Sequence, residues 1–248
     1  MWNKKLKIIL QVLLLVALIT YLVFALFKTD DQSKITVCSQ IEITVKDSAQ
    51  LDYITSSNVK MLLKSAKMYP QGERISRIDC KAIEAVLLRQ PYINTANCYK
   101  TPNGKVIIEA TQKKPIVRIM SNNGEDYYLD HNGFVLSSKG HPADIVIATG
   151  NIDRKLAKKE ILELANIIQE DNFWDCQIEQ INVTASREIQ LIPRVGDHIV
   201  LLGKGENLEE KLTRLKQFYK KILGKVGWDR YSMINLEFDN QIICTNKE

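Results

Sequence analysis

The stretch IILQVLLLVALITYLVFALF, residues 8–27, decides the organisation of this chain because it carries no charged side chain. Its 20 residues span about 30 Å as a helix, which is the thickness of the hydrocarbon core of a bilayer. Lys4, Lys5 and Lys7 precede it, and basic flanks favour the cytoplasmic side of a membrane. The pattern predicts a cytoplasmic tail at residues 1–7, a lipid-embedded helix from Ile8 to Phe27, and an exported remainder.

A cleaved signal peptide is the alternative interpretation of this stretch. The apolar region of a signal peptide usually spans about 7–15 residues and ends in a small-x-small cleavage site. Here the run is longer, and bulky Phe27 is a poor residue to precede a cut. A lipoprotein would need a small residue before a cysteine close to the run, whereas Cys38 follows Val37. The sequence therefore favours a retained anchor.

The charge balance of the exported part argues against a nucleic-acid partner. Of the net charge of +5, three units belong to the lysines before the anchor, so the remainder is nearly neutral. Nucleic-acid-binding domains usually carry a basic face or stripe. The composition, with 25% charged and 45% hydrophobic residues, is that of an ordinary globular protein.

The first exported region, residues 35–113, predicts a β-α-α-β-β unit after a polar linker at residues 28–34. Its first strand alternates Ile41, Ile43 and Val45 with polar residues. Asp79 is the expected N-cap of the second helix, and the sequence Asn-Gly between two β-rich runs predicts a closing hairpin. The expected elements lie at 41–46, 57–67, between Asp79 and Pro91, at 92–100 and at 105–111.

The second region, residues 114–248, predicts a mixed β-sheet domain with two long helices. Asn207 and Glu210 form a capping-box-like pair at the start of the second helix. The final element, Ser232–Cys244, is predicted as one long strand broken at residues 239–241. Strands are expected at 115–120, 126–130, 133–137, 145–148, 178–183, 188–193 and 198–202, with the helices after Asp153 and at Asn207. The predicted fold class is α+β.

Five cysteines, Cys38, Cys80, Cys98, Cys176 and Cys244, lie after the anchor without a CxxC spacing. The absence of a CxxC spacing argues against zinc and thioredoxin-type sites. Cys80 and Cys98 are candidates for a disulfide because both lie in the β-α-α-β-β unit, although connectivity does not follow from sequence. The sequence favours burial of most cysteines as small hydrophobic residues over a disulfide.

No catalytic constellation emerges from the remaining polar residues. Asp130-His131-Asn132-Gly133 offers acid–base groups but is typical of a tight turn. Gly203-Lys204-Gly205 lacks the full spacing of a phosphate loop and is also interpreted as a turn. We therefore expect no enzyme activity, metal, cofactor or small-molecule substrate.

Several stretches, in this order along the chain, resemble the FtsQ/DivIB family of bacterial cell-division proteins. Glu237 departs from the family pattern, because a basic residue is common at its position, and so does Ile116, where a small residue is usual. The resembling stretches are QPYINTA at 90–96, VIIE at 106–109 leading to KPIV at 114–117, YYLD at 127–130 with GFV at 133–135, LG at 202–203 with KL at 211–212, and INLEF at 234–238.

The resemblance implies a POTRA domain at residues 35–113 and an FtsQ-type β domain at 114–248. It implies a non-enzymatic scaffold of the bacterial divisome at the inner membrane and division septum, with a periplasmic C-terminal part. Its partners would be divisome proteins of the FtsB and FtsL type. By the same resemblance, the terminal strand would receive a strand of FtsB at Phe238, Asp239, Asn240 and Gln241.

Two other functions remain as alternatives. A POTRA-bearing component of outer-membrane assembly or secretion would continue into many amphipathic strands of about 10 residues, whereas two long helices interrupt the second region. A membrane-tethered cell-wall enzyme would need a cluster of titratable groups, and the sequence does not assemble one.

The sequence of the anchor predicts that the mature protein begins at or near Met1. The long apolar run and Phe27 at the cut position both oppose cleavage. Mass spectrometry of the protein isolated from membranes checks this expectation. A mature N-terminus between residues 25 and 40 would contradict it.

Overall fold

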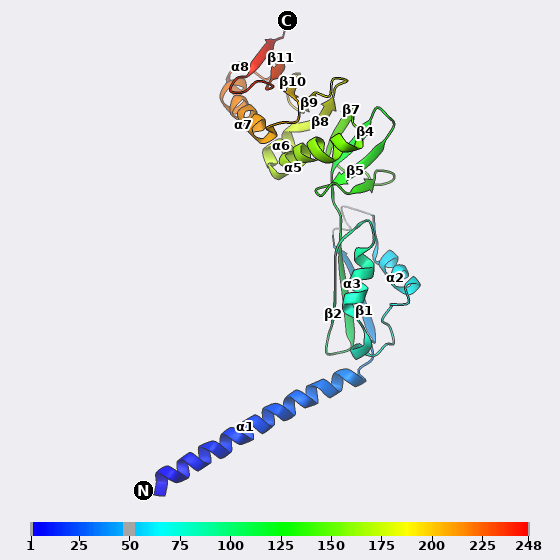
Figure 1. Ribbon diagram of the computed structural model, residues 1–248, viewed down its shortest axis with the longest axis vertical. Coiled ribbons are helices and arrows are strands. Elements are labelled where there is room, and N and C mark those ends of the chain that lie inside the picture. The colour runs from blue at the N-terminus through cyan, green and yellow to red at the C-terminus, as the bar shows by residue number, and fades with distance from the viewer. Residues whose placement is uncertain (1, 47–52, 248) are drawn as a thin grey trace. The chain divides into compact units, whose positions relative to one another are not determined.

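The computed structural model describes residues 2–46 and 53–247, and it gives the backbone alone for residues 2–6 and 26–35. Met1, the expected start of the mature chain, is outside the described residues. The chain divides into two compact units, Met1–Gln112 and Lys113–Glu248. In Figure 1 the first runs from blue to green and the second from green to red.

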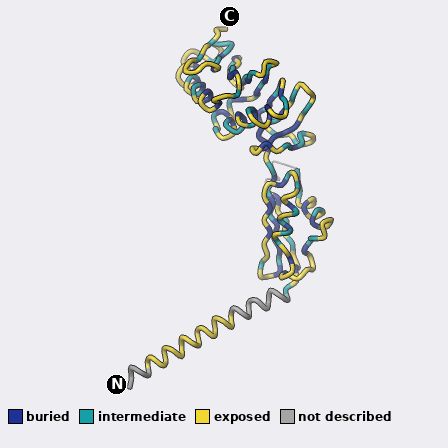
Figure 2. The backbone as a smooth tube through the Cα atoms, viewed as in Figure 1, coloured by how far each residue is buried: buried dark blue, intermediate teal, exposed yellow. Residues whose placement is uncertain are grey.

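The chain begins with α1 (Trp2–Ile35), one continuous helix. It is longer than the apolar run at 8–27, because the backbone stays helical through the polar linker expected at 28–34. The segment Lys7–Ala25 is long and apolar enough to cross a membrane, and it is exposed along its whole length (Figure 2). A helix that is apolar on all sides and lacks a protein cover suits a lipid environment. The helix is therefore consistent with a membrane anchor.

The rest of the first unit has the β-α-α-β-β order that the sequence predicts. Within the described residues, its three strands lie in the order β1-β3-β2, with β1 parallel and β2 antiparallel to β3. The elements are β1 (Gln40–Lys46), α2 (Ser56–Ser65), the 3₁₀ turn η1 (Ile75–Arg77), α3 (Cys80–Leu88), β2 (Ile93–Lys100) and β3 (Lys105–Gln112).

Local signals set the ends of these elements. The Asp79 side chain accepts a hydrogen bond from the Ala82 N–H at 3.1 Å and caps α3 as expected. Gly104 closes the β2–β3 hairpin with φ of 78°, and a Cβ there would lie 2.8 Å from the Val37 carbonyl oxygen. Glycine thus serves both the left-handed turn and the close approach of the chain. The buried core lies between the two helices and the sheet.

The second unit contains a nine-stranded sheet in the order β12-β11-β10-β9-β8-β7-β4-β5-β6 within the described residues. The predicted mixed β domain is confirmed. Its strands are β4 (Pro115–Ser121), β5 (Asp126–Asp130), β6 (Val135–Ser137), β7 (Val146–Gly150), β8 (Ile178–Val183), β9 (Ile189–Pro193), β10 (Ile199–Gly203), β11 (Tyr231–Asn235) and β12 (Ile243–Asn246).

Two helical crossovers connect parallel neighbours of this sheet, β7 to β8 and β10 to β11. Both crossovers move the chain in the same direction across the sheet. Right-handed connections therefore place both on one face, where they share a single buried core with the strands. The first comprises α4 (Arg154–Leu156), the π turn η2 (Ala157–Ile161), α5 (Leu162–Glu170) and α6 (Asn172–Gln177). The second comprises α7 (Leu208–Phe218), the π turn η3 (Tyr219–Leu223) and α8 (Gly224–Val226).

Two expectations for the second unit are wrong. Asn207 makes no side-chain cap at the start of α7, because it adopts a left-handed conformation with φ of 54°. The single strand expected over Ser232–Cys244 is two antiparallel strands, β11 and β12, joined by a turn. The polar residues expected as a break within one strand instead reverse the chain.

A buried histidine lies in the aromatic part of the second core. His198 Nε2 and Tyr219 Oη are 2.7 Å apart, and only 2% of each residue is exposed. The Tyr219 ring also contacts Trp174 and Trp228, with centroids 5.9 and 5.1 Å away. Burial lowers the pKa of His198 from its ordinary value, because the charged imidazolium loses its hydration there.

Because the pKa of His198 is lowered, we expect the second unit to lose stability in acid. Below the unfolded-state pKa of about 6.5, the unfolded chain binds a proton at His198 that the folded chain does not bind. The free energy of unfolding should therefore fall as the pH drops from about 7 to about 5.5. Urea unfolding followed by tryptophan fluorescence measures it. His198→Gln should reduce this dependence, while the exposed control His131→Gln should retain it, and equal slopes would contradict the assignment.

Candidate partner-binding edge

The end of the chain forms one edge of the nine-stranded sheet. β11 lies between β10, to which it is parallel, and β12, to which it is antiparallel. β12 pairs with β11 alone among the described residues. An edge strand presents unpaired N–H and C=O groups that another strand can bind.

The hydrogen bonds on either side of β11 show which groups of β12 point outward. The Leu236 N–H donates to the Leu201 carbonyl at 2.8 Å, and the Lys247 N–H donates to the Arg230 carbonyl at 3.1 Å. Because backbone groups alternate in direction along a strand, Ile243 and Thr245 face β11. The backbone N–H and C=O groups of Cys244 and Asn246 therefore face away from the sheet.

The four residues expected to bind a partner strand lie in the β11–β12 turn and not in a strand. Phe238, Asp239, Asn240 and Gln241 are all exposed, and Asn240 adopts a left-handed conformation with φ of 58°. Phe238 is 46% exposed, so it is not a core residue. The turn brings the four residues together beside β12, but their backbone is not the free edge.

Arg214 on α7 fixes this turn. Its guanidinium donates to the carbonyl oxygen of Phe238 at 2.9 Å and to that of Leu236 at 3.3 Å. One guanidinium group thus binds two backbone carbonyls of a segment without regular structure. Its planar fork of N–H donors allows both hydrogen bonds at once.

Lys211, one turn earlier on α7, holds the end of β10. Lys211 is 5% exposed, and its ammonium donates to the Leu202 carbonyl at 2.8 Å. Burial lowers its pKa. At the same place Gly203 adopts φ of 71°, and a Cβ there would lie 2.9 Å from Cγ of Glu237. Glu237 therefore packs on a glycine at the sheet end.

A shallow hollow of about 270 Å³ lies between the second crossover and the turn. Ile222 at its wall is 40% exposed, and Ile243 at the start of β12 is 46% exposed. Together with Phe238 they provide apolar surface next to the free backbone groups. The lining residues are Arg214, Gln217, Phe218, Lys221, Ile222, Asn240, Gln241 and Ile242.

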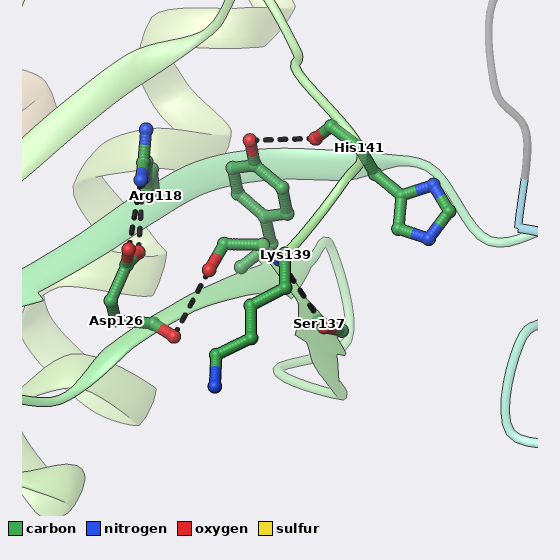
Figure 3. A network of polar contacts seen from close by, with 7 residues as sticks. Arg118, Asp126, Ser137, Lys139 and His141 are labelled. Carbon is green, nitrogen blue, oxygen red and sulfur yellow. Dashed lines mark hydrogen bonds and ion pairs between the residues drawn. The ribbon is translucent and has the colours of Figure 1, made fainter.

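The opposite edge of the sheet is the short strand β6, and the segment after β6 turns back toward β5. β6 has three residues, and the segment after it is tied to β5 by two hydrogen bonds, Ser138 Oγ to the Asp126 carbonyl and Tyr128 Oη to the His141 carbonyl. Arg118 and Asp126 join β4 to β5 through contacts of 2.8 and 3.0 Å (Figure 3). A very short edge strand is one of the ways in which proteins limit unwanted pairing, and β12, with four residues, is the longer of the two edge strands.

The polar motifs considered for chemistry form turns. The buried Asp130 carboxylate accepts from the N–H groups of Asn132 and Phe134 at 3.0 and 2.7 Å, which closes the turn at Gly133. Lys204 in the glycine-rich segment accepts a bond from Lys211 through its carbonyl oxygen. In the described part of the chain, no three His, Cys, Asp or Glu residues lie together as a metal site.

The family model described as FtsQ/DivIB, C-terminal related, matches residues 114–245, more than half of the chain. The chain belongs to the FtsQ/DivIB family. A second model, a POTRA-like domain, matches residues 36–111. No curated protein matches the chain.

Family membership agrees with the site. The FtsQ/DivIB and POTRA-like domains indicate a division-associated scaffold, and these families are generally non-enzymatic. The apolar helix α1 is consistent with a membrane anchor for such a scaffold. In this FtsQ/DivIB protein, the features that sequence reasoning missed are the strand β12 and the Arg214 contacts, since neither leaves a local sequence pattern.

We expect Arg214→Ala to loosen the β11–β12 turn, because both carbonyls lose a charged donor worth about 1.5–3 kcal/mol. Hydrogen–deuterium exchange of peptides covering residues 236–246 should accelerate in this variant. Lys221→Ala, which changes another residue of the same hollow, should leave exchange unchanged. Equal protection in Arg214→Ala and the unmodified chain would show that Arg214 does not hold the turn.

Proposed function

We propose that this FtsQ/DivIB protein is a single-pass scaffold of the bacterial divisome, recruited to the septum in the inner membrane. Residues 1–7 are the cytoplasmic tail, 8–27 the anchor in lipid, and 28–34 the juxtamembrane linker. The POTRA domain at 35–113 and the FtsQ-type β domain at 114–248 are periplasmic. The lysines before the apolar run support this orientation, and family membership supports the role in division.

The scaffold acts by strand addition at β12. The observation that carries this proposal is the outward direction of the Cys244 and Asn246 backbone groups at the end of the sheet. A partner strand there would extend the sheet through main-chain hydrogen bonds, with side chains supplying selectivity. The partner belongs to the FtsB/FtsL type of divisome protein.

The residues of the turn supply the side-chain part of the interface. Phe238 and Ile243 are exposed apolar groups beside the free backbone, and the hollow against α7 can receive an apolar side chain of the partner. Asp239, Asn240 and Gln241 form its polar rim. The turn thus contributes side-chain contacts to the proposed interface, whereas β12 contributes main-chain hydrogen bonds.

Asn246→Pro tests the ladder directly. Proline removes the outward N–H of an exposed residue and obstructs strand addition. The hydrogen bonds to β11 remain, because they belong to Ile243, Thr245 and Lys247. We expect this variant to bind the exported segment of the FtsB-like partner at least about tenfold more weakly, as measured by calorimetry.

Asn246→Ala is the matched control, since it keeps the backbone donor and should bind with nearly the original affinity. Circular dichroism should show both variants folded. Mid-cell recruitment of a fluorescent fusion is the second readout. Unchanged partner affinity in the folded proline variant would exclude β12 as the interface, and loss of binding in both variants would point to the side chain instead.

A further inference from the structure

Cys80 and Cys98 are brought together by the packing of α3 on β2. The Glu84 carboxylate accepts a hydrogen bond from the Cys98 N–H at 2.7 Å, which fixes one face of α3 against this residue of the strand. Cys80 lies four residues before Glu84 and therefore on the same helical face, one turn nearer the N-terminus. Cys80 packs against the core cluster that contains Cys98, and both are free thiols in the structure.

The environments of the two sulfur atoms differ. Cys98 is 8% exposed within the core of the unit, whereas Cys80 lies at its margin and is partly exposed. Burial, together with the neighbouring Cys80 thiol, raises the pKa of Cys98. An oxidant in solution would therefore meet Cys80 first, because access and thiolate character decide which thiol reacts.

We propose that Cys80 and Cys98 form a disulfide that ties the N-terminal end of α3 to β2 when the domain meets a disulfide oxidant. Its formation in the cell rests on the proposed export, because exported compartments are oxidising. The disulfide would join two parts of the POTRA domain and would leave the β12 edge unchanged.

The exchange balances with glutathione disulfide as the oxidant. The Cys80 thiolate attacks one sulfur of glutathione disulfide, which releases one glutathione and leaves a mixed disulfide. The Cys98 thiol loses its proton to water and attacks the Cys80 sulfur, which releases the second glutathione. Two protein thiols are oxidised to one disulfide, and one glutathione disulfide is reduced to two thiols.

The remaining cysteines are placed less well for this bond. Cys38 is buried before β1, where its Sγ contacts the carbonyl oxygen of Gln40 at 3.6 Å. Cys176 and Cys244 belong to the second unit. The odd cysteine count is thus consistent with one intradomain pair and three free thiols.

Mass spectrometry of the full-length protein in detergent tests the pairing. The protein is equilibrated with glutathione disulfide, denatured in an alkylating reagent without reductant, and digested. We expect a Cys80–Cys98 cross-linked peptide, with Cys38, Cys176 and Cys244 alkylated. Alkylation of both Cys80 and Cys98, or their linkage to other cysteines, would overturn the proposal. Because this result does not depend on export or partner binding, it is separable from a failure of the proposed function.

Thermal unfolding provides a second measurement. Closing a loop between positions eighteen residues apart restricts the unfolded chain, so reduction should lower the Tm of the POTRA domain by on the order of 10 °C. Cys176→Ala should keep this shift, and the double variant Cys80→Ala with Cys98→Ala should lose it. An oxidised wild-type protein whose Tm does not respond to reductant would contradict a stabilising bond, even if that double variant fails to fold.

Discussion

The parallel pairing of β11 with β10 is the constraint on which the candidate partner-binding edge depends. Parallel neighbours cannot be joined by a tight hairpin, so the chain must leave the sheet and return through a crossover. That crossover is α7 with its helical extension, and it carries Lys211 and Arg214 over the ends of both strands. β12 then has only the outer side of β11 available. The exposed edge is therefore a consequence of chain order as much as of its own sequence.

The sequence predicted the elements that have local causes. Asp79 caps α3 and Gly104 closes its hairpin, because both act on neighbouring residues. The end of the chain was harder, since alternating apolar residues continue from Met233 to Phe238 whether the chain extends or turns. The predicted side-chain cap at Asn207 is wrong for a related reason. The capping-box pattern assumes an extended backbone at the N-cap, whereas Asn207 adopts a left-handed conformation. Strand partners and backbone angles are set by distant packing.

The candidate site shows the same division between local and distant causes. The family resemblance predicts that the exposed residues of the turn bind a partner, and the structure places them together beside the sheet edge. Arg214 could not be identified, because on an amphipathic helix it looks like any solvated charge. Its acceptors are backbone carbonyls more than twenty residues later, and a carbonyl has no sequence signature. Contacts from side chain to distant backbone are invisible to pattern analysis.

The size of β12 determines how the edge can work. Four residues leave two with outward backbone groups, and hydrogen bonds of about 0.5–1.5 kcal/mol each would supply only a few kcal/mol. Micromolar affinity requires about 8 kcal/mol, so main-chain pairing alone is insufficient. In the proposed complex, burial of Phe238 and Ile243, together with the hollow against α7, would contribute the remainder. The contacts of Arg214 matter for that reason: they hold the backbone of the turn at Leu236 and Phe238, which would lower the ordering cost of binding in the proposed complex.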